Sequence, residues 1–357
     1  KPQANAPYLF LEYFENGSLE HSIQKLAIIT DRPPQPENLP DPPSVILWEF
    51  WRCLVTGVVG MEYPEIYFPN WDMNANVVYP SPNDLELQPR ISFVHNDLDP
   101  QNLFVGKTTR PRDPGHPHAP EIKVADLGSG NDFDHHTDPW LRGRMWSDMR
   151  KPGKTDYVPP EQFSEEWDYV DETPHRSRWE GAAVFTAGQF GWKTNLYQAA
   201  LSMQNLITRC YPRAPPMPVK MLVREGAMRG KMIWTYSGMT KVTKFPWCDP
   251  KLLLLVSQCL ADRPDMRPDL KELHARTMEG VRRTQDAVLP LAVAGSQKPM
   301  DKDWGTKPFA EQRSWSRAQL QAYMRRWLEG DVSKPTLDRF YQENSPPRQK
   351  WYNLRLP

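Results

Sequence analysis

Cysteine is scarce in this chain of 357 residues, and no two cysteines form a C-x-x-C pair. The four copies, Cys53, Cys210, Cys248 and Cys259, are scattered along the sequence. This spacing argues against a disulfide framework and against a zinc ribbon, and it is typical of a reducing compartment. We therefore expect an intracellular protein of the cytoplasm or the nucleus.

Net charge is also lacking, because 44 Lys and Arg residues balance 44 Asp and Glu residues. A chain without an overall field has no general attraction for nucleic acid or for an anionic membrane. We expect neither of them as a partner.

Long hydrophobic runs are few, and the most apolar one is "SVILWEFWRCLVTGVVGM" at residues 44–61. Glu49 and Arg52 interrupt this run. Charged side chains in the middle of an apolar stretch favour a buried helix over a membrane span.

Proline, in contrast, is abundant, with 38 copies. It clusters in residues 32–43 and 110–120 and near the C-terminus, where it predicts loops between elements. Residues 63–90 are polar, contain several prolines and indicate a long connection. The 14 tryptophans are spread along the chain, which favours a folded body.

Apolar patterns predict a mixed fold of the α+β class. We expect helices at residues 19–30, 44–61, 194–210 and 316–330, and two more within residues 249–284 around the loop "ADRPDMRP". We expect strands at residues 8–14, on both sides of residues 95–102, and from residue 121, with an irregular segment over residues 131–160.

The stretch "FVHNDLDPQNLFVG" at residues 93–106 sets polar residues between two apolar runs. Asp97 and Asn102 supply a carboxylate and an amide, and Asp126 supplies a second carboxylate at the end of a predicted strand. Phosphoryl transfer needs one carboxylate to orient the attacking hydroxyl, and an amide and a carboxylate to hold Mg²⁺. A strand–loop–strand hairpin would bring Asn102 and Asp126 together.

Five motifs, in this order, make the chain resemble the protein kinase superfamily over residues 8–284. "YLFLEYFENGSL" resembles the last N-lobe strand, the hinge and the first C-lobe helix. "HNDLDPQN" looks like the catalytic loop H-R-D-L-x-x-x-N, and "DLG" looks like D-F-G. "PPEQF" is similar to the A-P-E motif, and "RPDMRP" is similar to the arginine-bearing loop near the end of the C-lobe.

The resemblance implies a protein-kinase-like fold, mainly the α-helical C-lobe, with short β-hairpins at the catalytic loop. Residues 1–18 would form the last N-lobe strand and the hinge. Residues 19–288 would form the C-lobe, with Pro-rich inserts near 32–43, 63–90 and 107–120, and residues 289–357 a C-terminal extension.

The resemblance also implies roles in catalysis and in nucleotide binding. Asp97 would orient the acceptor hydroxyl and take its proton, and Asn102 and Asp126 would bind Mg²⁺. The predicted ATP-binding residues are Leu11 as gatekeeper, the backbones of Glu12 and Phe14 at the adenine, Ser18 at the ribose, and Leu103 under the adenine ring.

Further residues would have structural roles. His95 and Leu127 would stack in a hydrophobic column, with His95 a packed, hydrogen-bonded histidine. Glu161 would pair with Arg267 in a buried ion pair, and Asn195 would hold the catalytic loop by accepting hydrogen bonds.

Three residues depart from the pattern of the family. Asn96 stands where the family has an arginine that grips an activation-segment phosphate, and Asp99 stands where a lysine steadies the transferring phosphate. Asn195 replaces an aspartate. Only seven residues precede Tyr8, too few for a Gly-rich loop and a strand lysine, so we expect either an upstream truncation or a degenerate relative.

The expected function is ATP- and Mg²⁺-dependent transfer of the γ-phosphoryl group to a serine or threonine hydroxyl of a protein substrate. The alternative is a catalytically weak or dead pseudokinase that acts as a binding module. A minor alternative is a small-molecule kinase of the choline or aminoglycoside type. "HNDL" also resembles the catalytic loop of those enzymes, but they lack motifs similar to "PPEQF" and "RPDMRP". The Trp-containing C-terminal tail either packs on the body or binds a protein partner.

Overall fold

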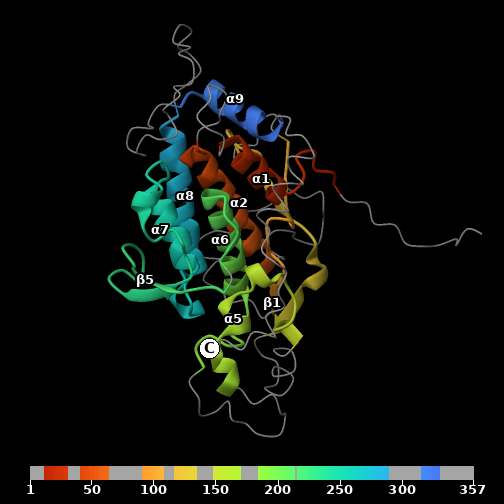
Figure 1. The fold of residues 1–357 in the computed structure, drawn as a ribbon, viewed down its shortest axis with the longest axis vertical. Helices are drawn as coiled ribbons and strands as arrows, with labels where there is room; N and C mark the ends of the chain where they lie inside the picture. Colours follow the sequence, from red (N-terminus) through yellow and green to blue (C-terminus); the bar gives the residue numbers. More distant parts are fainter. Residues whose placement is uncertain are drawn as a thin grey trace, which may run out of the picture.

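The computed structural model describes residues 12–30, 41–63, 91–107, 116–134, 148–169, 184–213, 215–288 and 315–329. Three long helices lie at its centre (Figure 1): α2 (Ser44–Glu62), α6 (Trp192–Thr208) and α8 (Leu270–Asp286). Helix α2 packs against both α6 and α8. At the crossing with α8, Gly280 leaves room for the Trp48 ring, because a Cβ there would lie 2.5 Å from ring carbons.

Helix α2 is the buried helix that the apolar run predicts. Its Glu49 is fully buried, and its carboxylate pairs with His118 Nδ1 at 2.8 Å and accepts hydrogen bonds from the Ala119 backbone and from Gln285. A buried carboxylate with several partners avoids the cost of an unsatisfied charge. Among the described residues, α2 alone has the length and hydropathy to cross a membrane, but 72% of its most apolar window is buried inside the protein.

The other helices surround this centre. They are α1 (Leu19–Thr30), α5 (Pro160–Phe163), α7 (Pro250–Cys259) and α9 (Arg317–Leu328). Short 3₁₀ helices cover Leu127–Ser129, Thr155–Tyr157, Glu165–Tyr169, Val242–Lys244 and Pro264–Met266. The predicted α-helices are therefore present, with their ends shifted by a few residues.

Helix α9 lies against α1 at one end of the molecule (Figure 1). Trp327 is fully buried and donates from its indole N–H to the Ser22 carbonyl at 2.8 Å. Trp315 is buried as well. Packing of the tail on the body is confirmed for these two residues, while Trp304 and Trp351 lie outside the described residues.

Six short strands in the described part of the chain form antiparallel pairs, so the α+β class is confirmed. They are β1 (Ile91–Val94), β2 (Leu103–Val105), β3 (Ile122–Val124), β4 (Asn131–Asp134), β5 (Val219–Leu222) and β6 (Met232–Thr235). Strand β2 pairs with β3 to form a hairpin. Strands β1 and β4, which come before and after this hairpin in the sequence, pair with each other. This nesting returns the chain to the 95–102 loop after β3.

Three strand predictions need correction. Strand β4 lies in the segment that we expected to be irregular. Its polar sequence "NDFD" does not predict a strand, but it pairs with β1 along its whole length. The β5–β6 hairpin has no counterpart among the predicted elements. Residues 12–14 are not a strand, and the rest of the predicted strand at 8–14 lies outside the described residues.

The last residue of α2, Glu62, should make stability depend on pH. Burial raises its pKa to about 7, although a hydrogen bond with Ser92 lowers it. The folded chain holds the Glu62 proton more tightly than the unfolded chain. The contribution of this group to the free energy of unfolding is therefore complete below the unfolded pKa of 4.5 and is lost as the pH rises through 7. We expect the free energy of unfolding to fall by about 3 kcal/mol through this group.

Urea unfolding at pH 5 and pH 8 checks this expectation, with Glu62→Gln as the comparison. The variant carries no titrating group at that position, so its stability should fall much less over the same range. An equal fall in both proteins would show that other groups are responsible.

Candidate functional site

Helix α6 fixes the 95–102 loop through side-chain hydrogen bonds. Asn195 accepts a hydrogen bond from the His95 backbone N–H at 2.9 Å and donates to the Phe93 carbonyl at 2.7 Å. Gln198 donates to the Asn96 carbonyl at 3.0 Å. The contact predicted for Asn195 is confirmed, and Gln198 is a second anchor that the sequence did not indicate.

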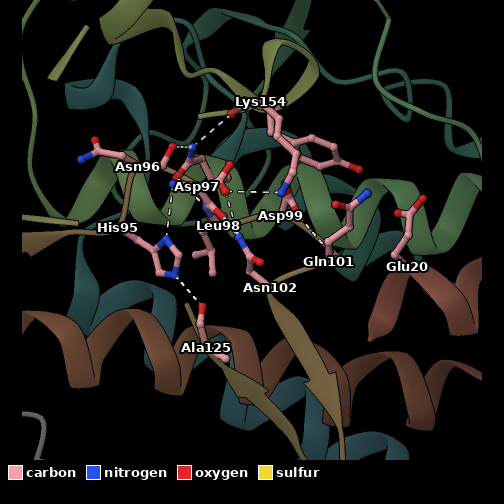
Figure 2. A network of polar contacts seen from close by, with 12 residues as sticks. Glu20, His95, Asn96, Asp97, Leu98, Asp99, Gln101, Asn102, Ala125 and Lys154 are labelled. Carbon is pink, nitrogen blue, oxygen red and sulfur yellow. Dashed lines mark hydrogen bonds and ion pairs between the residues drawn. The ribbon is translucent and has the colours of Figure 1, made fainter. Parts of the chain in front are cut away.

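The ring of His95 is fully buried and has a partner on each nitrogen (Figure 2). Nε2 lies 3.0 Å from the Ala125 carbonyl, which can only accept, so Nε2 carries the proton. Nδ1 accepts from the Asp97 backbone N–H at 3.3 Å. His95 is therefore a hydrogen-bonded structural residue, as predicted, that ties the loop to the end of β3.

Asn96 has the left-handed backbone conformation, with φ of 64°, which asparagine tolerates better than most residues. Its side-chain amide donates to the Ser129 carbonyl at 3.0 Å. Gly153 approaches from another segment, and a Cβ there would lie 2.4 Å from the Asn96 carbonyl oxygen. The absence of a side chain at Gly153, whose φ is +101°, thus lets this segment lie against the loop.

Asp97 lies at the centre of the polar network in Figure 2. Its Oδ2 accepts from Asn102 Nδ2 at 3.0 Å and lies 3.3 Å from Lys154 Nζ. Its Oδ1 is buried and has no hydrogen-bond partner within the described part of the chain. The Asp97 carboxylate is therefore held in place by one oxygen while the other lacks a partner.

Lys154 follows Gly153 and forms ion pairs with both carboxylates of the loop, Asp97 and Asp99. Asp99 is buried, which raises its pKa, and the bonds with Lys154 offset part of that rise. Burial lowers the pKa of Lys154, but the two carboxylates raise it more, so the net shift is upward. The Lys154 side chain remains 39% exposed, so its ammonium can reach a ligand.

The nested strands bring Asn102 and Asp126 to the same end of the β2–β3 hairpin. Leu103 is opposite Val124, and the Ala125 N–H donates to the Asn102 carbonyl at 2.9 Å. Asp126 follows Ala125 with a left-handed φ of 58°, and its exposed carboxylate accepts one long bond, 3.4 Å, from the Gly128 N–H. The β2–β3 hairpin thus brings the backbones of Asn102 and Asp126 close together, as the sequence predicts.

Three of the predicted nucleotide-binding residues lie on or against β2, and Glu12 contacts β3. The Phe14 ring is 5.6 Å from the Phe104 ring, and Ser18 bridges to Phe104. Glu12 forms an ion pair with Lys123 at 2.7 Å. Leu103 is fully buried and so faces protein rather than an open site, and Leu11 lies outside the described residues.

Leu127 differs from its predicted place. It is 55% exposed, and the partners of the His95 ring are polar atoms of Ala125 and Asp97. The 3₁₀ turn over Leu127–Ser129 has no buried residue, so Leu127 lies nearer the surface than a packed column implies, and its stacking with His95 stays a prediction.

The predicted pair of Glu161 and Arg267 is present, across 106 positions of sequence. Both side chains are fully buried and meet through two parallel bonds of 2.7 and 2.8 Å. Thr194 also donates to Glu161 at 3.0 Å, and Arg267 donates to the carbonyls of Ala261 and Lys193. This network joins α5 and α6 to the loop that precedes α8.

Lys154 is the most important residue of this site that sequence reasoning missed. It lies 57 positions from Asp97, and its sequence context, "PGKTDY", carries no apolar period or motif. The one local feature is the glycine before Lys154. Its importance is visible only in the folded chain, where Gly153 lies against the Asn96 carbonyl.

A scan against models of protein families finds no match to this chain, and a search of curated proteins also finds none. The interpretation of the site therefore rests on its residues and their geometry.

Proposed function

We propose that the chain is a kinase-like phosphotransferase that moves the γ-phosphoryl group of ATP to a serine or threonine hydroxyl of a protein. The Asp97 carboxylate carries this proposal. One of its oxygens is fixed by Asn102 and Lys154, and the other is buried without a partner within the described residues. The side chain as a whole is 18% exposed, so an acceptor hydroxyl can approach this carboxylate and give up its proton there.

The oxygen atoms of Asn102 and Asp126 suit Mg²⁺, which prefers carboxylate and amide oxygens. The Asn102 amide uses its nitrogen toward Asp97, and its Oδ1 has no hydrogen-bond partner in the described part of the chain. The Asp126 carboxylate is exposed and makes only one long hydrogen bond. When bound, Mg²⁺ would neutralise charge on the phosphates of ATP.

In the proposed reaction the acceptor hydroxyl oxygen forms a bond to the γ-phosphorus. The bond from this phosphorus to the bridging oxygen breaks, and ADP leaves with the electron pair. Asp97 takes the hydroxyl proton. Lys154 keeps its own proton and faces the charge of the transferring group, a role that a carboxylate at position 99 cannot fill.

The relation to kinases is supported by the Glu161–Arg267 pair. The resemblance alone predicted this contact between two distant motifs, and two buried parallel hydrogen bonds join the residues. A chance likeness of short motifs would not be expected to yield a paired, fully buried charge at that place.

Binding of Mg²⁺–ATP tests the proposal at its first step. We expect Mg²⁺–ATP to raise the melting temperature of the protein, since a ligand of the folded state stabilises it by mass action. Asp126→Ala should remove the shift. Asp148→Ala, at a side chain that is 80% exposed, should keep it. A shift of equal size in Asp126→Ala would contradict the proposed metal site.

Lys154 gives a second expectation. Lys154→Ala should lower kcat by roughly 10²-fold, the low end of what removal of one charge-stabilising donor costs. Lys154→Arg should retain part of the rate, because it keeps the cation. Lys151→Ala, at a side chain that is 75% exposed, is the matched control. An unchanged kcat for Lys154→Ala would remove this residue from the mechanism.

One observation favours binding without catalysis as a second candidate. Without ligand, the Lys154 ammonium lies against Asp97, and Asp99 adds negative charge beside the reacting groups. In a pseudokinase, Lys154 would stay paired with Asp97 and would not contact a phosphate. Wild-type protein that gains no stability from Mg²⁺–ATP would support this reading against the first.

A further inference from the structure

The β5–β6 hairpin projects from the body near α7 (Figure 1), and it carries several exposed apolar side chains. Large exposed apolar side chains gather here more than elsewhere in the described chain. Those of the hairpin and its approach are Met217, Val219, Leu222, Met232 and Trp234, with exposed fractions from 38% to 60%. A cluster of this kind indicates an interaction surface, whereas single exposed apolar residues need no explanation.

The strand register explains how the two faces of the hairpin differ. Met221 is opposite Ile233, and both are buried on the face toward Ala261. Their neighbours point the other way: Leu222 is opposite Met232, and Lys220 is opposite Trp234 with its ammonium 5.0 Å from the ring centroid. The outer face is therefore an apolar ladder that has no partner in the described chain.

Positive charge surrounds this ladder. Lys220, Arg224, Arg229 and Lys231 are exposed, and none of them forms an ion pair within the described residues. The single acidic residue between positions 217 and 234 is Glu225, which lies 3.8 Å from Lys251 and from Arg276. The surface is thus apolar at its centre and cationic at its rim.

A hollow of about 480 Å³ opens at the base of β5 and extends the surface. Met217, Val219, Tyr236 and Phe245 contribute to its apolar wall. Its charged lining residues are Arg213, Lys244 and Asp156, so two cations face one anion. The hollow can hold an apolar anchor residue of a bound chain.

The hairpin is held rigidly enough to serve as a binding surface. At its tip, the Ala227 N–H donates to the Glu272 carboxylate of α8 at 3.0 Å. At its base, the Asp262 N–H donates to the Trp234 carbonyl at 3.0 Å, and Tyr236 N–H donates to the Leu260 carbonyl. Contacts at both ends limit the entropy lost when a partner binds.

We propose that the outer face of the β5–β6 hairpin, with the adjoining hollow, docks an acidic segment of another protein that carries apolar anchor residues. The ladder and the hollow would take the anchors, Arg224, Arg229 and Lys231 would pair with carboxylates at the rim, and Lys220 would do so beside Trp234. This proposal is independent of the proposed phosphoryl transfer, because none of its residues contacts Asp97.

The arrangement favours a protein over an anionic membrane. Loops that insert into membranes carry their apolar residues at the tip, but this tip contains Arg224, Gly226, Arg229 and Gly230. The apolar side chains lie along the face and at the base instead. A hollow beside a row of exposed apolar side chains suits the anchor residues of a peptide.

Fluorescence anisotropy on the full chain tests the proposal with a labelled synthetic peptide that alternates Asp or Glu with Leu or Trp. We expect it to bind, and the same peptide with Lys in place of the acidic residues to bind roughly tenfold more weakly or not at all. Failure of the acidic peptide to bind wild-type protein would overturn the proposal, as would equal binding of both peptides.

Variants locate the binding. Met232→Ser with Trp234→Ser, and separately Lys220→Glu with Lys231→Glu, should each weaken binding by roughly tenfold or more. Met278→Ser, at another exposed apolar residue, is the matched control and should bind as wild type. Unfolding curves of the variants should match that of wild type, since all the replaced side chains are exposed. Equal affinity in all variants, or tighter binding to phosphatidylserine vesicles that the same variants abolish, would refute the docking of a protein segment.

Discussion

Glu161→Gln is expected to lower the free energy of unfolding by about 3–5 kcal/mol. The change leaves the guanidinium of Arg267 buried without its counter-charge, in a place that solvent cannot reach. The remaining partners of Arg267 are carbonyl groups of Ala261, Lys193 and Asp262, which cannot replace a carboxylate. Chemical denaturation of wild type and variant measures the difference.

Two comparisons separate the loss of a buried charge pair from a general weakening. Glu161→Leu combined with Arg267→Met should destabilise less than Glu161→Gln alone, because no buried charge is left unpaired. Glu279→Gln removes one partner of an exposed pair with Arg282 and should change stability little. If Glu161→Gln were as mild as Glu279→Gln, the buried pair would not hold these elements together.

Asp97→Asn is expected to reduce kcat for phosphoryl transfer by about 10²–10⁴-fold, the range for removal of a general base. The amide keeps the shape of the side chain, and its oxygen can still face Asn102 or Lys154. It cannot take a proton from the acceptor hydroxyl. Initial rates at saturating ATP measure the effect, and KM for ATP should change little because Asp97 does not hold the nucleotide in this scheme.

The matched control for this change is Asp148→Asn. Asp148 belongs to the segment that carries Lys154, but its side chain is exposed and its ion pair with Lys151 is long, at 3.9 Å. Its rate should equal that of wild type. A similar loss in both variants would point to a disturbed segment rather than to the chemistry of Asp97.

The helices could be predicted because their apolar residues recur at helical spacing or form one continuous apolar run. The run over α2 and the period through Leu196, Ala199, Ala200 and Met203 in α6 are examples, and these residues are buried. The pairing of Glu161 with Arg267 could also be predicted, but only from the resemblance of two motifs, since no local pattern links them.

What could not be predicted depends on contacts between distant segments. Strand β4 has a polar sequence and is extended because β1 supplies its hydrogen bonds. The hairpin of β5 and β6 shows no clean alternation, because apolar residues such as Leu222 and Ile233 lie on both faces, one exposed and one buried.

The same reason explains the partial success at the site. The spacing of Asp97, Asn102 and Asp126 indicated a common place for them, and the nested strands bring the segments together. Lys154 reaches Asp97 only because Gly153 fits against the Asn96 carbonyl, which is a property of the folded chain. Leu127 carries no mark in the sequence that it is exposed.

The central claim is that the loop around Asp97 transfers phosphoryl groups. The most direct measurement is the incorporation of label from γ-labelled ATP into a protein rich in serine and threonine, with and without Mg²⁺, by wild type and by Asp97→Asn. We predict label on serine or threonine that requires Mg²⁺ and the Asp97 carboxylate. Absence of label with wild type, or equal label with Asp97→Asn, would contradict the claim.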